Sequence, residues 1–218
     1  MLSKDDVPML MHDEILERTV TDSNMIGTVF NNLNSKELQT INVGKYFNPN
    51  DTTTFIPTFE EVLEYCLKEQ IFMNIEIKPA EGKDIITSRI VAEKTVQYYS
   101  HLSEVGVAPM FSSFSFDALK VAKETAPSIP RGYLIHEPLD TLPNWKEQAS
   151  ELEVTALHLN HEHLTLSLVE EIKSMKYGIF VYTVNTIERA RELLSWGVDC
   201  LCTDNIQDFS HLALELAD

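Results

Sequence analysis

The sequence predicts a parallel α/β fold, on three observations. From about residue 70 onward, short apolar runs rich in β-branched residues alternate with amphipathic helical stretches. Strict alternation of strand and helix indicates parallel βα units. Most of the strand-like runs are nearly continuous in apolar residues, as buried parallel strands are. Helix start and stop signals also fall where the helical stretches begin and end.

Six strands are expected, with a helix between each consecutive pair. The expected strands are residues 71–79, 108–115, 131–136, 155–161, 178–185 and 200–206. The expected helices between them are residues 83–102, 116–127, 143–153, 164–176 and 186–198. Ahead of the first strand, Thr58 and Glu61 form a capping box for a helix over residues 61–70. Gly197 ends the last helix as a C-terminal stop.

The length of the chain predicts one domain. A chain of 218 residues can bury a full hydrophobic core, so we expect a single domain over residues 1–218. Residues 14–56 differ from the rest, because they are polar and rich in Asn and Thr, with a short helix expected at residues 35–41. We interpret residues 14–56 as an insertion, an excursion from the main scaffold rather than a separate core.

Charge and composition exclude several classes of partner. The formal net charge is −17, which disfavours nucleic acids and anionic membranes. No apolar run approaches the length of a membrane-spanning helix, and charges stand where an export signal needs an apolar run. Cys66, Cys200 and Cys202 show neither disulfide nor zinc spacing. We therefore expect a cytoplasmic protein with reduced core cysteines.

The segment NIEIKP is the first candidate for a functional site. In a strand, Asn74, Glu76 and Lys78 share one face, while Ile75 and Ile77 share the other. The polar face must point into a polar environment, because a buried unpaired charge is costly. Inside a βα barrel this face leads to the mouth, where active sites lie. The alternative is a structural Glu–Lys pair inside the barrel.

His12 is the second candidate. It follows the apolar run VPMLM and precedes Asp13. A histidine at a strand end with a carboxylate beside it suits general acid–base chemistry, because its pKa lies near neutrality. The alternative is an ordinary surface histidine at a strand end.

Polar residues also gather where the later strands end. In parallel strands these ends meet at one edge, which is typical of a ligand-binding rim. Individually, each residue also fits a helix cap or a hydrogen bond within a loop. The residues are Ser112, Ser113, Ser115, His158, Asn160, Thr183, Asn185, Thr203 and Asp204.

Taken in order, these motifs resemble those of the glycerophosphodiester phosphodiesterases. The segments LSKDDVPMLMHDEILERT, IPTFEEVL, NIEIKP, SSFS, IPRG, LHLNH, VYTVN and WGVDCLCTDN follow one another as they do in that family, over essentially the whole chain. The segment LHLNH is similar to the corresponding segment in the cytosolic bacterial branch of the family. The resemblance implies a TIM-type (β/α) barrel that hydrolyses a small-molecule glycerophosphodiester to glycerol 3-phosphate and an alcohol, with a divalent cation, Mg²⁺ or Ca²⁺, in the mouth.

The resemblance also assigns roles to individual residues. His12 matches one of two catalytic histidines, and Glu76 matches a metal-binding carboxylate. Lys78 matches a lysine that offsets the phosphate charge, and we place Asn185 with it at the substrate phosphate. Carboxylate oxygens suit a hard cation, and such a cation would also attract an anionic substrate to an acidic protein.

The sequence also departs from the family pattern. The family's His-Arg-Gly strand and Glu-x-Asp strand have no counterpart here, so we expect an N-terminally truncated barrel with about six of eight strands. Asp6 stands where the family usually has a turn glycine, which Asp tolerates. Three explanations compete: a misplaced start codon, a truncated relic, or a barrel completed by a complementing chain or homo-oligomer.

These departures bear on activity. We expect this chain alone to have little or no hydrolytic activity. The alternative to an enzyme is an inactive pseudoenzyme that keeps the scaffold. A related phospholipase acting on phosphoinositides or sphingolipids fits the motifs less well.

Overall fold

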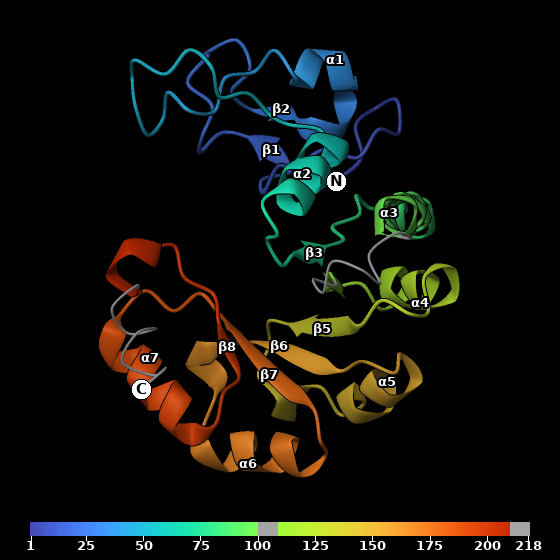
Figure 1. The fold of residues 1–218 in the computed structure, drawn as a ribbon, viewed down its shortest axis with the longest axis vertical. Helices are drawn as coiled ribbons and strands as arrows, with labels where there is room; N and C mark the ends of the chain where they lie inside the picture. Colours follow the sequence, from blue (N-terminus) through green and yellow to red (C-terminus); the bar gives the residue numbers. More distant parts are fainter. Residues whose placement is uncertain (100–108, 210–218) are drawn as a thin grey trace. The chain divides into compact units, whose positions relative to one another are not determined.

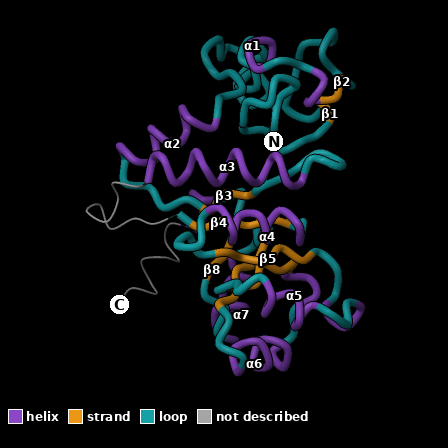
Figure 2. Tube along the Cα trace, turned by 90° about the vertical axis from the view of Figure 1, so that its right-hand side faces the viewer, coloured by secondary structure: helices purple, strands orange, loops and turns teal. Residues whose placement is uncertain are grey.

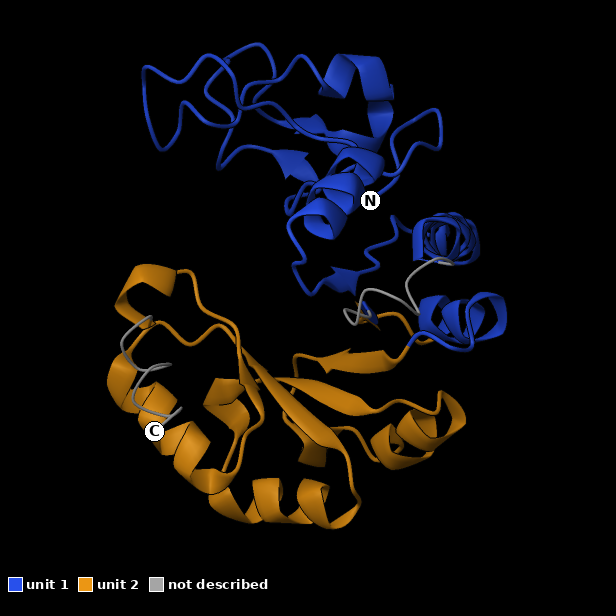
Figure 3. Ribbon diagram, viewed as in Figure 1, with its two compact units in different colours: residues 1–111, 117–129 blue, residues 112–116, 130–218 orange. Residues whose placement is uncertain are grey.

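The computed structural model describes residues 1–99 and 109–209. The chain forms two compact units (Figure 3). Unit 1 comprises residues 1–111 and 117–129, and unit 2 comprises residues 112–116 and 130–218. The single domain over residues 1–218, with its insertion over residues 14–56, stays a prediction.

Unit 1 contains a short antiparallel strand pair, β1 and β2, followed by helices, strand β3 and the first half of strand β4 (Figure 1). Helix α2 packs against the long helix α3 (Figure 2). The elements that begin in this unit are β1 (Ile15–Leu16), β2 (Thr28–Val29), η1 (Phe30–Asn32), α1 (Ser35–Leu38), α2 (Phe59–Lys68), β3 (Asn74–Glu76), α3 (Asp84–Tyr99) and β4 (Met110–Ser113), with α4 (Phe116–Thr125) following.

Unit 2 continues the alternation of strand and helix. In Figure 1, α5, α6 and α7 lie along one face of its strands. Its elements are β5 (Arg131–Ile135), η3 (Leu139–Thr141), α5 (Trp145–Glu151), β6 (Ala156–Asn160), η4 (His161–His163), α6 (Leu166–Ser174), β7 (Gly178–Tyr182), α7 (Ile187–Trp196) and β8 (Cys200–Leu201).

The strands after residue 70 form a six-stranded sheet in the order β3-β4-β5-β6-β7-β8. Sequence order and spatial order coincide, as expected for consecutive βα units. Strands β5 to β8 are parallel, in a register that pairs Leu134 with His158 and His158 with Phe180. The prediction of six parallel βα strands is therefore confirmed. The expected strand start at residue 108 and helix end at residues 100–102 lie outside the described residues.

The local signals in the sequence act as predicted. The Thr58 side chain accepts from the Glu61 N–H, and the Glu61 carboxylate accepts from the Thr58 N–H, so the capping box of α2 is complete. Gly197 ends α7 with a left-handed φ of +98°, a conformation that costs glycine little. Asp6 adopts φ +57° in the first turn, as expected of a residue in place of a turn glycine.

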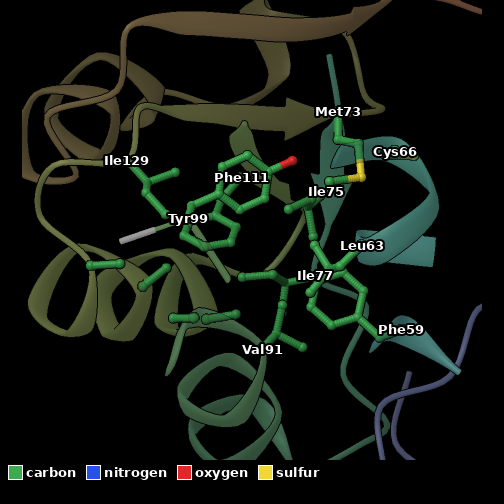
Figure 4. Packing of buried hydrophobic residues seen from close by; sticks show 14 residues of the cluster. Phe59, Leu63, Cys66, Met73, Ile75, Ile77, Val91, Tyr99, Phe111 and Ile129 are labelled. Carbon is green, nitrogen blue, oxygen red and sulfur yellow. The ribbon is translucent and has the colours of Figure 1, made fainter. Parts of the chain in front are cut away.

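The larger apolar cluster of unit 1 forms around β3 and the helices α2, α3 and α4 (Figure 4). Ile75 and Ile77 are buried in it at 7% and 1% exposure. Asn74 and Glu76 on the opposite face are exposed. The predicted alternation of NIEIKP is confirmed, so the polar residues of β3 are directed away from the core.

Several apolar side chains of residues 14–56 are buried, and the interpretation of this segment as an excursion from the main scaffold stays a prediction. A second cluster of buried side chains lies largely within this segment: Met9, Leu16, Val20, Phe30, Leu38, Ile41 and Ile56. Leu16 and Leu38 are fully inaccessible to solvent. The apolar residues here follow neither a helical nor a strand period, so pattern reading did not reveal their convergence.

The cysteines are only partly as expected. All three are free thiols. Cys66 is buried in the unit 1 cluster, and burial raises the pKa of its thiol. Cys200 is exposed and Cys202 half-buried, so neither is a core residue. Cys200 lies in β8, the last strand of the sheet in the described part of the chain, and Cys202 directly follows this strand. No helix in the described part of the chain is long and apolar enough to span a membrane.

His158 is an unusual core residue of unit 2. Its side chain lies in the middle of β6 at 0% exposure, and within residues 1–99 and 109–209 neither ring nitrogen has a hydrogen-bond partner. Its ring stacks on Phe180, with centroids 4.5 Å apart. Burial lowers the pKa of His158 to about 4. The neutral form is therefore the one that the fold accommodates.

The buried His158 predicts a pH-dependent stability. Between pH 4 and the ordinary histidine pKa of about 6.5, the unfolded chain binds a proton here that the folded chain does not. The free energy of unfolding should therefore be largest above that range and fall by about 3 kcal/mol as the pH decreases through it. Urea unfolding of the wild-type chain and His158→Leu across this range measures the difference. Identical pH dependence in both proteins would contradict the prediction.

Candidate functional site

The segment that carries His12 is fixed by backbone pairing within unit 1. The Leu10 N–H donates to the Pro57 carbonyl oxygen (3.0 Å), and the Phe59 N–H donates to the Pro8 carbonyl oxygen (2.9 Å). The apolar run before His12 therefore pairs with the residues that cap α2. This pairing holds His12 at the end of an extended segment, as the sequence predicts.

A cavity of about 770 Å³ in unit 1 brings together three of the four predicted site residues. His12, Glu76 and Lys78 all line it. The Lys78 ammonium donates a hydrogen bond to the backbone carbonyl oxygen of His12 (2.9 Å), across 66 positions of sequence. Because β3 directs Asn74 and Glu76 away from the core, its polar face supplies one wall of the cavity.

Asp13 links His12 to an arginine that sequence reading did not select. One oxygen of Asp13, Oδ1, lies 2.7 Å from His12 Nδ1 and accepts from Arg18 Nη2 at 3.1 Å. Burial raises the pKa of the Asp13 carboxyl, but the hydrogen bonds and charges of His12 and Arg18 outweigh it and leave the pKa below its ordinary value. Asp13 is thus held as an anion beside the histidine.

The remainder of the cavity is mainly apolar, and the sequence did not predict this apolar lining. Its apolar lining includes Met9, Met11, Val43, Phe47, Phe59, Val62, Phe72 and Val91. Arg18 also lines it, so two cations, Arg18 and Lys78, stand near one carboxylate, Glu76. Arg18 is also paired with Asp13, so the two cations are balanced by two carboxylates, and Arg18 and Lys78 are the groups of the cavity that an anionic ligand would contact.

Asn185, the fourth predicted site residue, lies in unit 2, where its side chain makes three hydrogen bonds. Its Oδ1 accepts from Thr203 Oγ1 (3.1 Å) and from the Asp204 N–H (2.9 Å). Its Nδ2 donates to Asp204 Oδ2 (3.1 Å). These bonds fasten the loop after β8 to the end of β7. The role of Asn185 at a substrate phosphate stays a prediction.

The expected polar rim is only partly exposed. Ser112, Ser113 and His158 are completely buried at 0% exposure, so they lie inside unit 2 and not on an accessible rim. His158 falls in mid-strand, because β6 continues for two residues beyond it. Asn160, at the end of that strand, accepts from the Glu162 N–H as a helix cap. For Asn160, the simpler interpretation as a cap is confirmed.

Comparison with known proteins identifies the family. The model of the glycerophosphoryl diester phosphodiesterase family matches residues 1–208. The chain belongs to this family of hydrolases. A glycerophosphodiester phosphodiesterase of Caldanaerobacter subterraneus is 26% identical over 214 residues, covering 97% of this chain and 82% of the relative. One from Bacillus altitudinis is 28% identical over 213 residues, covering 93% and 79%.

A solved structure supports the same assignment. A phosphodiesterase of Oleispira antarctica, in complex with sn-glycerol 3-phosphate, matches with a TM-score of 0.85 and 26% identity, covering 97% of this chain and 81% of that one. The fold of this glycerophosphoryl diester phosphodiesterase domain is therefore that of the family's α/β barrel, of which the six parallel strands form part.

The family generally uses a divalent cation, and the residues described here do not fit one. Within residues 1–99 and 109–209, no group of three His, Cys, Asp or Glu side chains could hold a metal ion. Glu76 is the one carboxylate among the residues that line the cavity, and two cations line it as well. Mg²⁺ and Ca²⁺ sites need more oxygen ligands than this set supplies.

We therefore predict weak cation binding by this chain. Titration calorimetry with Mg²⁺ or Ca²⁺ should show no saturable binding below about 1 mM, because one carboxylate beside Arg18 and Lys78 cannot replace the hydration shell. Glu76→Gln should give the same thermogram as the wild type. Sub-millimolar binding that is lost in Glu76→Gln would contradict this prediction and would establish Glu76 as a ligand.

Proposed function

We propose that the function of this chain is hydrolysis of glycerophosphodiesters to glycerol 3-phosphate and an alcohol, with the cavity of unit 1 as the reacting site. The expectation that the chain alone has little or no activity stays a prediction. The observation that carries the proposal is the convergence of His12, Glu76 and Lys78 on one cavity, in a chain of the phosphodiesterase family. The bound sn-glycerol 3-phosphate of the Oleispira relative is consistent with the product proposed here.

In the proposed reaction, His12 transfers a proton at Nε2. Its Nδ1 is occupied by Asp13, so Nε2 is the ring nitrogen left for acid–base work. Hydrolysis breaks the bond between phosphorus and the oxygen of the departing alcohol, which takes up a proton. A new P–O bond forms to the oxygen of water, which loses a proton. Either proton transfer suits a histidine near neutral pH.

Lys78 is proposed to bind the phosphate and to hold the histidine segment in place. Its ammonium is a compact positive charge, and its bond to the His12 carbonyl oxygen places it beside the reacting site. Glu76, as a carboxylate, would be a ligand for a cation, Mg²⁺ or Ca²⁺, only with help from further oxygen donors. A cytoplasmic location and assembly with another chain also remain proposals.

Replacing Lys78 by Met should raise KM for a glycerophosphodiester by about 10- to 100-fold, because a hydrogen bond to a charged group contributes about 1.5–3 kcal/mol. Steady-state kinetics measures the change. Lys83→Met is the matched control, because Lys83 pairs with Asp6 and does not line the cavity. An equal rise in both variants would mean that only the overall charge matters.

The proposed function is tested by release of glycerol 3-phosphate from glycerophosphoethanolamine. The purified chain is assayed with added Mg²⁺, with added Ca²⁺ and with a chelator. Release that depends on the chain and disappears in His12→Ala would support the proposal. No release under any of these conditions would overturn it for this chain and favour the pseudoenzyme that keeps the scaffold.

A further inference from the structure

We propose that Arg18 is a positioning residue for His12, acting through the carboxylate of Asp13. This inference rests on the proposed function, because it names the group that prepares His12 for proton transfer. It concerns three side chains that the short segment from His12 to Arg18 brings together.

The first step is the bond between the histidine and the aspartate. A carboxylate anion accepts hydrogen bonds and donates none. The 2.7 Å contact between His12 Nδ1 and Asp13 Oδ1 therefore requires the proton of the neutral imidazole to sit on Nδ1. This leaves Nε2 with a free lone pair, ready to accept a proton. An ionised Asp13 thus selects the useful tautomer of His12.

The second step is what keeps Asp13 ionised. Its side chain is only 19% exposed, and its other oxygen, Oδ2, is buried with no hydrogen-bond partner among the described residues. Burial favours the protonated acid, and a protonated Asp13 could donate to His12 Nδ1 and stabilise the opposite tautomer. Arg18 opposes this by donating to the same oxygen that His12 contacts. Its guanidinium stays charged at every physiological pH.

The third step is how the fold places Arg18. The residue follows β1, which pairs with β2 through Ile15 opposite Val29, and the Gly27 N–H donates to the Leu16 carbonyl oxygen. Leu16 is fully buried, so the strand pair is anchored immediately before Arg18. The Arg18 side chain itself is 55% exposed. Its removal should therefore leave the fold intact.

Arg18 also lines the cavity, so a direct contact with the substrate phosphate is the competing role. The titratable and charged groups around His12 include Asp13 and Arg18 on its own segment, Glu76 and Lys78 from the end of β3, and the amino group of Met1, which also lines the cavity. The two roles differ in what they change. A positioning residue affects the state of His12 in the free enzyme, whereas a phosphate ligand affects substrate affinity.

The deciding experiment is ¹⁵N NMR of the histidine rings in the substrate-free chain, at a pH well above the ordinary histidine pKa. The spectrum of His12→Gln identifies the His12 signals. The Nδ1–H tautomer should predominate in the wild type and in Arg89→Met, which removes an exposed arginine of α3 outside the cavity. It should lose its predominance in Asp13→Asn and decrease in Arg18→Met, which releases the Asp13 oxygen that Arg18 holds against His12, and Arg18→Lys should restore it.

Kinetics supplies the second arm. Arg18→Met should lower kcat by about 10-fold with KM within about twofold of the wild type, and Arg18→Lys should recover most of kcat. An unchanged His12 tautomer in Arg18→Met overturns the inference, whether or not the chain turns over substrate. A rise in KM with unchanged kcat overturns it in favour of phosphate binding. A chain without turnover refutes the proposed function alone, because the NMR result still decides the role of Arg18.

Discussion

Replacing His12 by Gln is expected to lower kcat for glycerophosphodiester hydrolysis by about 10³-fold. Glutamine can hydrogen-bond to Asp13 but cannot exchange a proton near neutral pH. The His12 side chain is 78% exposed, so the free energy of unfolding should change by no more than about 0.5 kcal/mol. Kinetics on glycerophosphoethanolamine and urea unfolding of the same preparation measure the two quantities.

His163→Gln is the control for this prediction. His163 is exposed in the short helix η4 of unit 2, and the structure gives its ring one neighbouring ring, that of His136. Its replacement should leave kcat within about twofold of the wild type. Undiminished turnover in His12→Gln would remove His12 from the reaction. A comparable loss in His163→Gln would show that the assay reports a general effect of losing a histidine.

The parallel sheet and one wall of the cavity could be predicted from the sequence, because local periodicity encodes them. NIEIKP alternates strictly, so the burial of Ile75 and Ile77 and the exposure of Asn74 and Glu76 follow from strand geometry alone. The capping box of α2 and the stop at Gly197 are likewise properties of a few adjacent residues.

The role of Arg18 could not be predicted in this way. Arg18 is five residues from Asp13, a spacing that belongs to neither a helix face nor a strand face. The two side chains meet because the chain turns after β1, and that turn depends on pairing with β2 more than ten residues away. An exposed arginine in a polar segment gives no signal of such a contact.

The hydrogen bonds of the Asn185 side chain could not be predicted for a related reason. Its three side-chain hydrogen bonds all lead to the loop after β8, 18 or 19 positions further along the chain. Whether a polar residue at a strand end faces a ligand or fastens a neighbouring loop depends on the register between strands. Spacing within one strand does not contain that information.

Gly132→Ala is expected to destabilise the chain by about 3 kcal/mol, the upper part of the range for overpacked cores. Gly132 lies in β5 beneath the His158 ring, and an added Cβ would overlap that ring. The ring cannot move away easily, because it is fully buried and stacks on Phe180 with 23° between the ring planes. Close packing of the interior leaves no space for both groups. Urea unfolding of the variant measures the loss.

A double-mutant cycle shows whether this one contact is responsible. His158→Ala alone should also destabilise the chain, because it leaves a cavity where the ring packs. In the double variant, the alanine at position 132 should fill part of that cavity. The combined loss should then be smaller than the sum of the two single losses by at least about 1 kcal/mol. Additive losses would mean that glycine is needed at position 132 for its backbone and not for the space that the His158 ring occupies.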